Sequence, residues 1–240
     1  MAINKNDDAE RTRAVRSMFG AIAPTYDTLN RILSFGVDQG WRREMVQKLP
    51  NTGPLKVLDL ACGTGDVSIE IVKARPEAIV FGGDLTLPML KAGLPKIKKA
   101  RMADVVTLQA LSAEDLPYRD SSFDAITIAF GIRNVVRREQ ALSEMARVLK
   151  PGGKLLILDF SMPPNPFIKA LYSLYFHRVL PLIGGLISGN MEAYKYLPRS
   201  VEGFPPRDTF AKMMETAGFK DVSHRDFTFG VSTLYEGIKA

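Results

Sequence analysis

The sequence predicts an α/β fold with a mostly parallel, doubly wound sheet of seven strands, and three observations support this prediction. Short apolar runs alternate with helical patterns through most of the chain. A glycine-rich turn, Ala61–Gly65, directly follows the first of these runs. Near the C-terminus, two further strand patterns are joined around Gly230, as expected for an antiparallel hairpin at a sheet edge. A chain of 240 residues is long enough for one such domain with an insertion.

The N-terminal 50 residues are expected to form helices that cover the ligand edge of the sheet. Residues 15–23 show a short amphipathic pattern that stops at Pro24. Asp27 is expected to cap a second helix, which ends at Gly36. A third helix is expected to start at Asp38 and to turn its apolar residues inward.

The strand Lys56–Leu60 and the turn after it indicate a ligand site. Gly63 and Gly65 can adopt positive φ, which lets backbone N–H groups approach a ligand closely. A dinucleotide fingerprint would require glycine or alanine at position 68, where this chain has Ser68. The Asp59 carboxylate would oppose a pyrophosphate but suits a ligand with positive charge and no phosphate. S-adenosylmethionine fits this description.

A second acid favours the same cofactor. The strand Ile79–Asp84 ends in a carboxylate at the position where Rossmann-type units bind ribose hydroxyls, and Leu85 would lie beside the adenine. The alternative is that Asp59 and Asp84 are only strand-end acids beside an ordinary turn. The presence of both signals in one βαβ unit favours the cofactor site.

The rest of the chain continues the alternation and then interrupts it. The expected elements are helix 66–75, strand 79–84, helix 88–100, strands 105–110 and 123–130, helix 139–149, strand 154–160, helix 207–217 and strands 222–227 and 232–238. Lys150–Gly153 is expected to close the helix before it. Leu171–Ser188 is apolar but too interrupted to span a membrane, so an inserted cap is expected there. One domain therefore has four parts, which are an N-terminal helical lid (1–50), a cofactor-binding core (51–161), a helical cap insertion (162–206) and a C-terminal helix and hairpin (207–240).

Ligands of open α/β sheets bind outside the carboxyl ends of the strands, which selects four loops. In one of them, Ser112 and Ala113 are expected to meet the adenine edge, and a simple acidic surface loop is the alternative. In another, Arg133 and Asn134 are expected beside the methyl donor. A structural arginine in a salt bridge is the alternative for Arg133. The Asn/Asp-Pro-Pro-Tyr motif of amine methyltransferases is absent from this loop, which disfavours methylation of amino groups.

Composition restricts the partners. The chain is 46% hydrophobic and 24% charged, which describes a globular protein. The net charge of +6 favours anionic partners, but the basic residues are scattered, so no nucleic-acid partner is expected. Cys62 is the only cysteine, which excludes an internal disulfide and a cysteine-based metal cluster, and no metal is expected. A reducing cytoplasm is the simplest location for a chain with one cysteine. Secretion is not expected, because the charged N-terminus does not resemble a signal peptide.

Two longer motifs carry a family resemblance. The first runs from Tyr26-Asp27-x-Leu29-Asn30 to Trp41, and the second runs from Arg147-Val148-Leu149-Lys150-Pro151-Gly152-Gly153 to Asp159-x-Ser161. Together with the glycine turn and Phe130–Asn134, they make the chain similar to the class I S-adenosylmethionine methyltransferases, and within these to the menaquinone/ubiquinone C-methyltransferases. The departures from the family pattern are Leu29 for methionine, Asp38 for histidine, Asp159 for glutamate, and Ala129 where some relatives have a cofactor-contacting serine.

The resemblance implies methyl transfer from S-adenosylmethionine to a ring carbon of a prenylated quinol, with demethylmenaquinol becoming menaquinol. Arg133 would stabilise a ring oxyanion, Asn134 would orient it or a water, and Tyr26 would reach it from the lid. The base is not assigned, and His177 and Tyr194 are weaker candidates. The residues expected to bind the cofactor are Asp59, Gly63, Thr64, Gly65, Asp84, Leu85, Ser112, Ala113 and Ala129.

Several alternatives remain open from the sequence. The substrate is a naphthoquinol or the benzoquinol of the ubiquinone pathway, or else another small phenol or acid. A non-catalytic, membrane-associated quinone-binding subunit and a nucleotide-dependent dehydrogenase are the rival classes. Residues 171–188 are expected to contact the membrane, which would place the protein at its inner face. Ordinary core packing or a homodimer face is the alternative for this segment.

Overall fold

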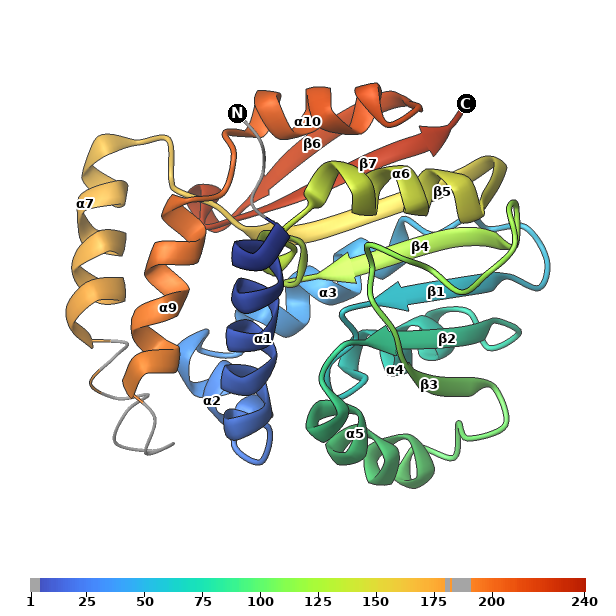
Figure 1. Cartoon of the computed structure of the whole chain (residues 1–240), viewed down its shortest axis with the longest axis horizontal. Helices are drawn as coiled ribbons and strands as arrows, with labels where there is room; N and C mark the ends of the chain where they lie inside the picture. The colour runs from blue at the N-terminus through green and yellow to red at the C-terminus, as the bar shows by residue number, and fades with distance from the viewer. Residues whose placement is uncertain (1–4, 180–181, 183–190) are drawn as a thin grey trace.

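A seven-stranded sheet forms the centre of the chain in a computed structural model that describes residues 5–179, 182 and 191–240. The strand order is β3-β2-β1-β4-β5-β7-β6 (Figure 1). The strands are β1 (Lys56–Leu60), β2 (Ile79–Asp84), β3 (Val106–Ala110), β4 (Phe123–Ala129), β5 (Leu149–Phe160), β6 (Phe219–Phe227) and β7 (Ser232–Lys239). The first five pair in parallel, and β7 runs antiparallel to both β5 and β6. The predicted fold class and C-terminal hairpin are confirmed.

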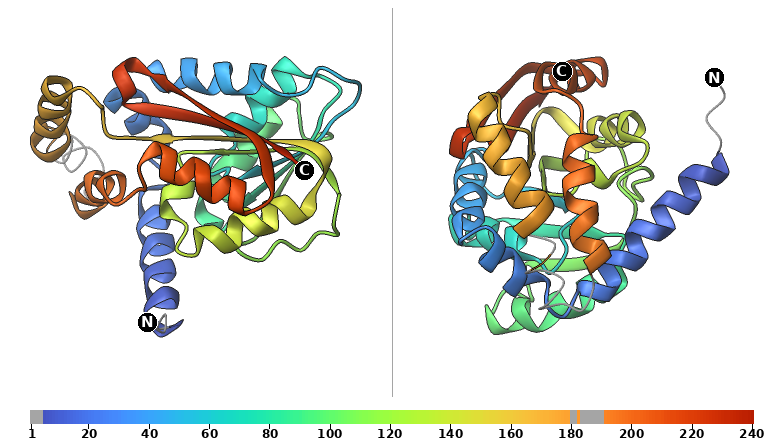
Figure 2. Two further views of the ribbon diagram at one scale, coloured as in Figure 1. Left: turned by 90° about the horizontal axis from the view of Figure 1, so that it is seen from above. Right: turned by 90° about the vertical axis from the view of Figure 1, so that its left-hand side faces the viewer.

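Helices cover both faces and one end of this sheet (Figure 2). They are α1 (Lys5–Ile22), α2 (Tyr26–Leu33), α3 (Val37–Gln47), α4 (Asp66–Ala74), α5 (Leu87–Lys99), α6 (Arg138–Val148), α7 (Pro166–Leu174), α9 (Met191–Glu202) and α10 (Arg207–Thr216). The described part of the chain also contains three short helical turns, which are η1 (Ile132–Asn134), η2 (Tyr175–Val179) and η3 (Thr228–Gly230). No helix of the described residues is long and apolar enough to cross a membrane.

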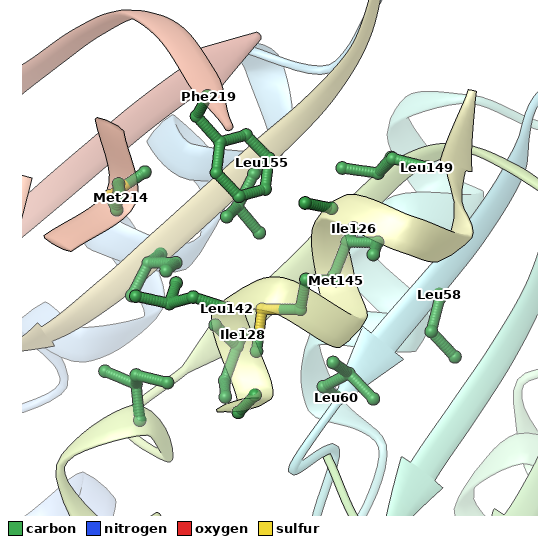
Figure 3. Packing of buried hydrophobic residues seen from close by; sticks show 14 of the residues in the cluster. Leu58, Leu60, Ile126, Ile128, Leu142, Met145, Leu149, Leu155, Met214 and Phe219 are labelled. Atoms are coloured by element: carbon green, nitrogen blue, oxygen red, sulfur yellow. The ribbon is translucent and has the colours of Figure 1, made fainter. Parts of the chain in front are cut away.

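Alternation along each strand divides the core into two layers. Leu58 and Ile126 pack with α6 and α10, as the close view in Figure 3 shows. Their neighbours Val57 and Ala125 point to the opposite face and pack with α3 and α4. Side chains of successive strand residues point to opposite faces, so a strand that is apolar throughout must be covered on both sides. The continuous apolar runs in the sequence therefore reflect a three-layer fold.

A third apolar cluster joins the N-terminal helices to the inserted ones. Ile22 and Leu29 pack against Tyr172, Phe176 and Val201. In Figure 1, α1, α2, α7 and α9 all lie at the end of the sheet toward which the parallel strand arrows point. Strand order reverses between β1 and β4 at this same end, which is where open α/β sheets bind ligands.

Three expected details are wrong. Helix α1 begins at Lys5, ten residues before the amphipathic pattern, because the charged residues 5–14 extend a helix that is only partly packed. Asp27 does not cap α2; it lies in the first turn and its carboxylate contacts Thr64 and Lys96 instead. Lys150–Gly153 lies within β5, because Leu149 already pairs with Phe123 of β4.

Candidate active site

A cavity of about 130 Å³ lies at the carboxyl ends of β1, β2 and β4. It is lined by six of the nine residues predicted to bind a cofactor, which are Gly63, Asp84, Leu85, Ser112, Ala113 and Ala129. From α1, Thr12, Val15, Arg16 and Phe19 line the opposite wall. These four residues recur at helical spacing, so one face of α1 covers the cavity. We call this space the cofactor cavity.

Asp84 is held ready to accept further hydrogen bonds in the cofactor cavity. The backbone N–H of Gly63 donates to its Oδ2 at 2.9 Å, and the backbone N–H of Thr86 donates to its Oδ1 at 2.7 Å. Burial raises the pKa of the carboxyl group, and these two N–H groups oppose that effect. Each carboxylate oxygen has a second lone pair, so two vicinal hydroxyls of a ribose can still bind. Gly63 has φ +55°, and a Cβ there would meet no atom within 4 Å, so the space beside the turn is open.

Asp59, Thr64 and Gly65 do not line the cofactor cavity. Asp59 is 1% exposed, and its carboxylate accepts hydrogen bonds from Ser68 Oγ at 2.6 Å and Thr127 Oγ1 at 2.8 Å. Thr64 Oγ1 donates to Asp27 Oδ1 at 2.6 Å. Through these hydrogen bonds, Asp59 and Thr64 connect the strand end and the glycine turn to α2, α4 and β4.

The burial of Asp59 makes stability depend on pH. Desolvation raises the pKa of its carboxyl group to about 6, against the hydrogen bonds from Ser68 and Thr127. In the unfolded chain an aspartate titrates near about 3.9, so between these values the folded protein binds more protons than the unfolded one. The free energy of unfolding attributable to Asp59 therefore falls as pH rises through this window, by up to about 3 kcal/mol.

Asp59→Asn is expected to remove this pH-dependent contribution to the free energy of unfolding while keeping the shape of the side chain. Urea denaturation of both proteins at pH 4.5 and pH 7 measures it. The free energy of unfolding of the wild type minus that of Asp59→Asn should be lower at pH 7 than at pH 4.5. A difference between the two proteins that does not change with pH would contradict the account.

A second, larger cavity of about 290 Å³ adjoins the first, and we call it the acceptor cavity. Phe19, Tyr26 and Phe130 line both cavities. Aromatic side chains dominate the acceptor cavity, and the further ones are Phe35, Trp41, Phe160, Tyr172, Tyr175, Phe176 and Tyr196. Polar groups are few, as is typical of a site for an apolar ligand with a small number of polar atoms.

Arg133 lines the acceptor cavity and also forms a buried ion pair. Its Nη1 contacts Asp159 Oδ1 at 2.7 Å, its backbone N–H donates to Asp159 Oδ2 at 3.1 Å, and its Nε donates to Ser200 Oγ at 3.3 Å. Burial alone would lower the pKa of Arg133, but the Asp159 carboxylate raises it, so the guanidinium stays charged. Both sequence hypotheses thus have support, because the arginine is structural and also faces the cavity.

The other two catalytic candidates lie at the border between the cavities. Tyr26 lines both, and its burial raises the pKa of its hydroxyl, with Arg42 opposing. Asn134 lines the cofactor cavity, and its Oδ1 accepts a hydrogen bond from Tyr196 at 3.0 Å. His177 instead pairs with Glu202 at 2.9 Å on the surface and lines neither cavity, and the side chain of Tyr194 is outside the described residues.

Comparison with known proteins identifies the family of this chain. The model of the ubiE/COQ5 methyltransferase family matches residues 5–239, which is nearly the whole chain. The chain belongs to the ubiE/COQ5 methyltransferase family. The matched region includes α1, α7 and α9 as well as the strands of the sheet.

Two curated relatives are similar to this chain over nearly their whole length. A ubiquinone/menaquinone biosynthesis C-methyltransferase UbiE from Geobacter sp. (strain M21) is 50% identical over 232 residues, covering 96% of this chain and 98% of the relative. A demethylmenaquinone methyltransferase from Thermus thermophilus is 48% identical over 220 residues, covering 92% of this chain and 99% of the relative.

Similarity to solved structures, at low sequence identity, supports only the fold of this chain. The [4+2]-cyclase SpnF superposes with a TM-score of 0.71 at 13% identity, covering 94% of each chain. A Thermotoga maritima protein described as an S-adenosylmethionine-dependent methyltransferase, possible histamine N-methyltransferase, has a TM-score of 0.65 at 18% identity, covering 93% of this chain and 99% of its own. One fold thus hosts different activities, and the function must be argued from the ubiE/COQ5 sequence and the cavities.

Some residues of the site were not predicted from the sequence. Lys96, which no sequence pattern singled out, pairs with Asp27 at 2.6 Å and with Asp66, and so joins α2 to the start of α4 beside the glycine turn. Phe130 and Phe160 form adjacent parts of the acceptor cavity wall, with ring centroids 4.7 Å apart. Phe130 directly follows β4 and Phe160 is the last residue of β5, and this position at a strand end is the signal that could have singled them out.

Proposed function

We propose that this chain transfers a methyl group from S-adenosylmethionine to a ring carbon of a prenylated quinol, converting demethylmenaquinol to menaquinol. The observation that carries the proposal is the pair of adjoining cavities, one suited to a nucleoside and one lined by aromatic rings, which meet at Tyr26 and Phe130. The names of the ubiE/COQ5 relatives support a quinone substrate. The benzoquinol counterpart in ubiquinone biosynthesis is the second candidate, because the name of the Geobacter relative includes both pathways.

The residues of the cofactor cavity fit S-adenosylmethionine. Asp84 would accept the ribose hydroxyls, and Leu85, Ser112 and Ala113 would surround the adenine. When bound, this cofactor supplies a methyl group on a positively charged sulfur, which is a ready target for an electron-rich carbon. Residues 1–50 would act as the lid, since one face of α1 lines the cavity. Asp59, Thr64 and Gly65 would then act on the cofactor only through the shape of the turn.

On the acceptor side, the chain must stabilise negative charge on a ring oxygen. Arg133 keeps its charge in a buried position and lines the acceptor cavity, so it would stabilise an oxyanion. Asn134 and Tyr26 would orient the ring oxygen or a water at the border of the two cavities. The aromatic side chains of the acceptor cavity would hold the ring carbon in line with the methyl group.

A deletion of the gene in its own organism tests this function in the cell. Mass spectrometry of the extracted quinones should show accumulation of a demethylated species, and restoring the gene should remove it. An unchanged quinone profile in the deletion strain would contradict the proposal.

We also propose that the protein contacts the bilayer at the mouth of the acceptor cavity, in the cytoplasm at the inner membrane face. Two phenylalanines support this contact, because both are highly exposed and both have a left-handed backbone. Phe35 has φ +52° and is 83% exposed, and Phe229 has φ +57° and is 75% exposed. Phe35 and Thr228 line the acceptor cavity, so both turns lie at its mouth. A left-handed backbone is uncommon for a bulky residue and carries strain, which is typical of functional positions.

Helix α7 adds to this apolar rim, which we define as Phe35, Phe229, Phe167, Leu171 and Leu174. Phe35 approaches Tyr175 with ring centroids 6.5 Å apart, so the α2–α3 turn meets the end of α7. The right view of Figure 2 looks onto this end of the molecule. Residues 28–37 and 162–178 contain no acidic residue, but they contain Arg31, Lys169 and Arg178. Apolar tips among basic side chains suit an anionic lipid surface. Of the predicted segment 171–188, residues 180–181 and 183–188 lie outside the described residues.

Replacing the two phenylalanines tests the membrane contact. Phe35→Asn with Phe229→Asn should preserve folding, since asparagine tolerates a left-handed backbone. Sedimentation with vesicles that contain anionic lipid should show binding weakened by about tenfold or more, from the lost burial of two aromatic rings. Leu94→Ser, on the exposed side of α5, is the matched control. Equal partitioning of the double variant and the wild type would refute the contact. Phe176, in contrast, is buried in the third cluster, so changing it would disturb the fold.

A further inference from the structure

Unpartnered polar atoms gather around the acceptor cavity. Four buried side-chain atoms in the described part of the chain have no hydrogen-bond partner, and they are Asp38 Oδ2, Arg42 Nε, Tyr172 Oη and Tyr235 Oη. The first three belong to residues that line the acceptor cavity. Buried polar groups in native proteins are nearly always paired, and each exception needs an explanation. One carboxylate oxygen and two N–H or O–H groups beside one cavity are what a bound hydroxylated ligand would satisfy.

Asp38 is the acceptor in this group. It lies in the first turn of α3 and is 3% exposed. Its Oδ1 accepts a hydrogen bond from Ser34 Oγ at 2.6 Å, which fixes the carboxylate plane. Its Oδ2 lies 3.1 Å from Arg42 Nη1, an ion pair without hydrogen-bond geometry. Oδ2 therefore keeps its capacity to accept a proton or a hydrogen bond from a ligand.

Arg42 is shared between Asp38 and a second carboxylate. Its Nη1 also donates to Asp66 Oδ2 at 3.1 Å, so one guanidinium serves two carboxylates. The charged and titratable groups that face Asp38 come from several elements. Ser34 from the α2–α3 turn and Arg42 from α3 contact it directly, and Asp66 of α4 acts through Arg42. The other charged and titratable groups that line the acceptor cavity with Asp38 are Tyr26 of α2, Arg133 of η1, Tyr172 of α7, Tyr175 of η2 and Tyr196 of α9.

Two guanidinium groups stand over neighbouring rings of the cavity wall. The Arg42 guanidinium carbon lies 5.3 Å from the ring centroid of Phe130, and that of Arg133 lies 5.3 Å from the ring centroid of Phe160. These two rings are themselves 4.7 Å apart. The wall thus offers two separate polar positions, and a quinol carries two oxygens on opposite sides of its ring.

We propose that Asp38 and Arg42 form a second polar subsite, which binds one ring hydroxyl of the quinol and in which Asp38 accepts the hydroxyl proton. This inference rests on the proposed quinol methylation. Arg133 then serves the other ring oxygen. The family resemblance places a histidine at position 38, and an aspartate there retains the ability to take a proton.

The proposed step balances in atoms and electrons. Asp38 takes the proton of the hydroxyl, and the electron pair of the O–H bond moves toward the ring. The ring carbon next to the oxygen bonds to the methyl carbon, and the methyl–sulfur bond breaks with its electron pair left on sulfur. The ring carbon then loses its hydrogen as a proton to solvent, and the oxygen regains a proton from Asp38. Each turnover releases one proton and one S-adenosylhomocysteine.

Asp38→Asn tests the subsite in the full-length protein. With a short-chain demethyl-naphthoquinol and S-adenosylmethionine, we expect kcat to fall by about 10²–10⁴-fold, the usual contribution of a general base. The calorimetric Kd for S-adenosylmethionine should not change, because Asp38 does not line the cofactor cavity. Asp208→Asn is the matched control, since that carboxylate is 98% exposed on α10.

The pH profile of kcat separates a proton acceptor from a merely structural residue. The wild type should lose activity toward low pH, and Asp38→Asn should lose that limb and gain activity steadily with rising pH, as ionised quinol becomes available. Asp38→His should recover part of the activity, with the acid limb moved toward about pH 6.5, where an imidazole ordinarily titrates. If Asp38→Asn keeps wild-type kcat and pH profile, the inference is overturned while the proposed function stands. A wild type that methylates no quinol would overturn both.

Discussion

Arg133→Ala is expected to lower the free energy of unfolding by about 3–5 kcal/mol and to slow methyl transfer by about 10²–10³-fold. The stability loss follows from Asp159, whose fully buried carboxylate would lose its ionic partner. The rate loss follows from the lost positive charge in the acceptor cavity. Affinity for S-adenosylmethionine should change little, because Arg133 does not line the cofactor cavity.

Chemical denaturation and turnover with a soluble demethyl-quinol measure the two effects separately. Arg225→Ala is the matched control, since its ion pair with Glu44 is on the surface and such pairs contribute about 0–1 kcal/mol. Measurements of turnover should use conditions in which Arg133→Ala is folded, as shown by circular dichroism. Turnover near the wild-type rate in the folded variant would make Arg133 purely structural.

Asp84→Ala is expected to weaken binding of S-adenosylmethionine by about 1–3 kcal/mol, or about 5–150-fold in Kd. The carboxylate has two tasks, because it would bind the ribose and it also accepts the backbone N–H groups of Gly63 and Thr86. Its removal would therefore loosen the glycine turn as well. Isothermal titration calorimetry measures the effect.

Two further variants make the Asp84 result specific. Asp84→Asn keeps one accepting oxygen and should have an intermediate Kd. Asp104→Ala removes an exposed carboxylate before β3, at the other end of the sheet, and should bind like the wild type. An unchanged Kd in Asp84→Ala would remove Asp84 from the site.

Much of the fold could be predicted because its local signals agree with its tertiary structure. The bounds of β1 and β2 match the apolar runs, since each run is followed by a turn that the chain must make to start a helix. The start of α1 could not be predicted, because charged residues 5–14 lack a periodic apolar face. The start of β5 was hidden by Pro151 and two glycines, which usually end a helix but here continue a strand.

The site was predictable where it follows the strand ends and unpredictable where it depends on packing between distant segments. Asp84 and Arg133 line cavities after β2 and β4, as the topology requires. Asp59 shares the same pattern, but its side chain points away from the cavity toward Ser68. Asp38 lines the acceptor cavity because α2, α3, α7 and α9 surround the same space, and no local pattern predicts how helices so far apart in the sequence come together.

The most direct test of the central claim uses the purified protein with S-adenosylmethionine carrying a deuterated methyl group and with a short-chain demethyl-naphthoquinol. Mass spectrometry and NMR of the product identify where the label is attached. The adjoining cavities and the buried Arg133 predict one labelled methyl group on the ring carbon, with both ring oxygens unmodified. No labelled quinol, or a label found on a ring oxygen, would contradict C-methylation by this chain.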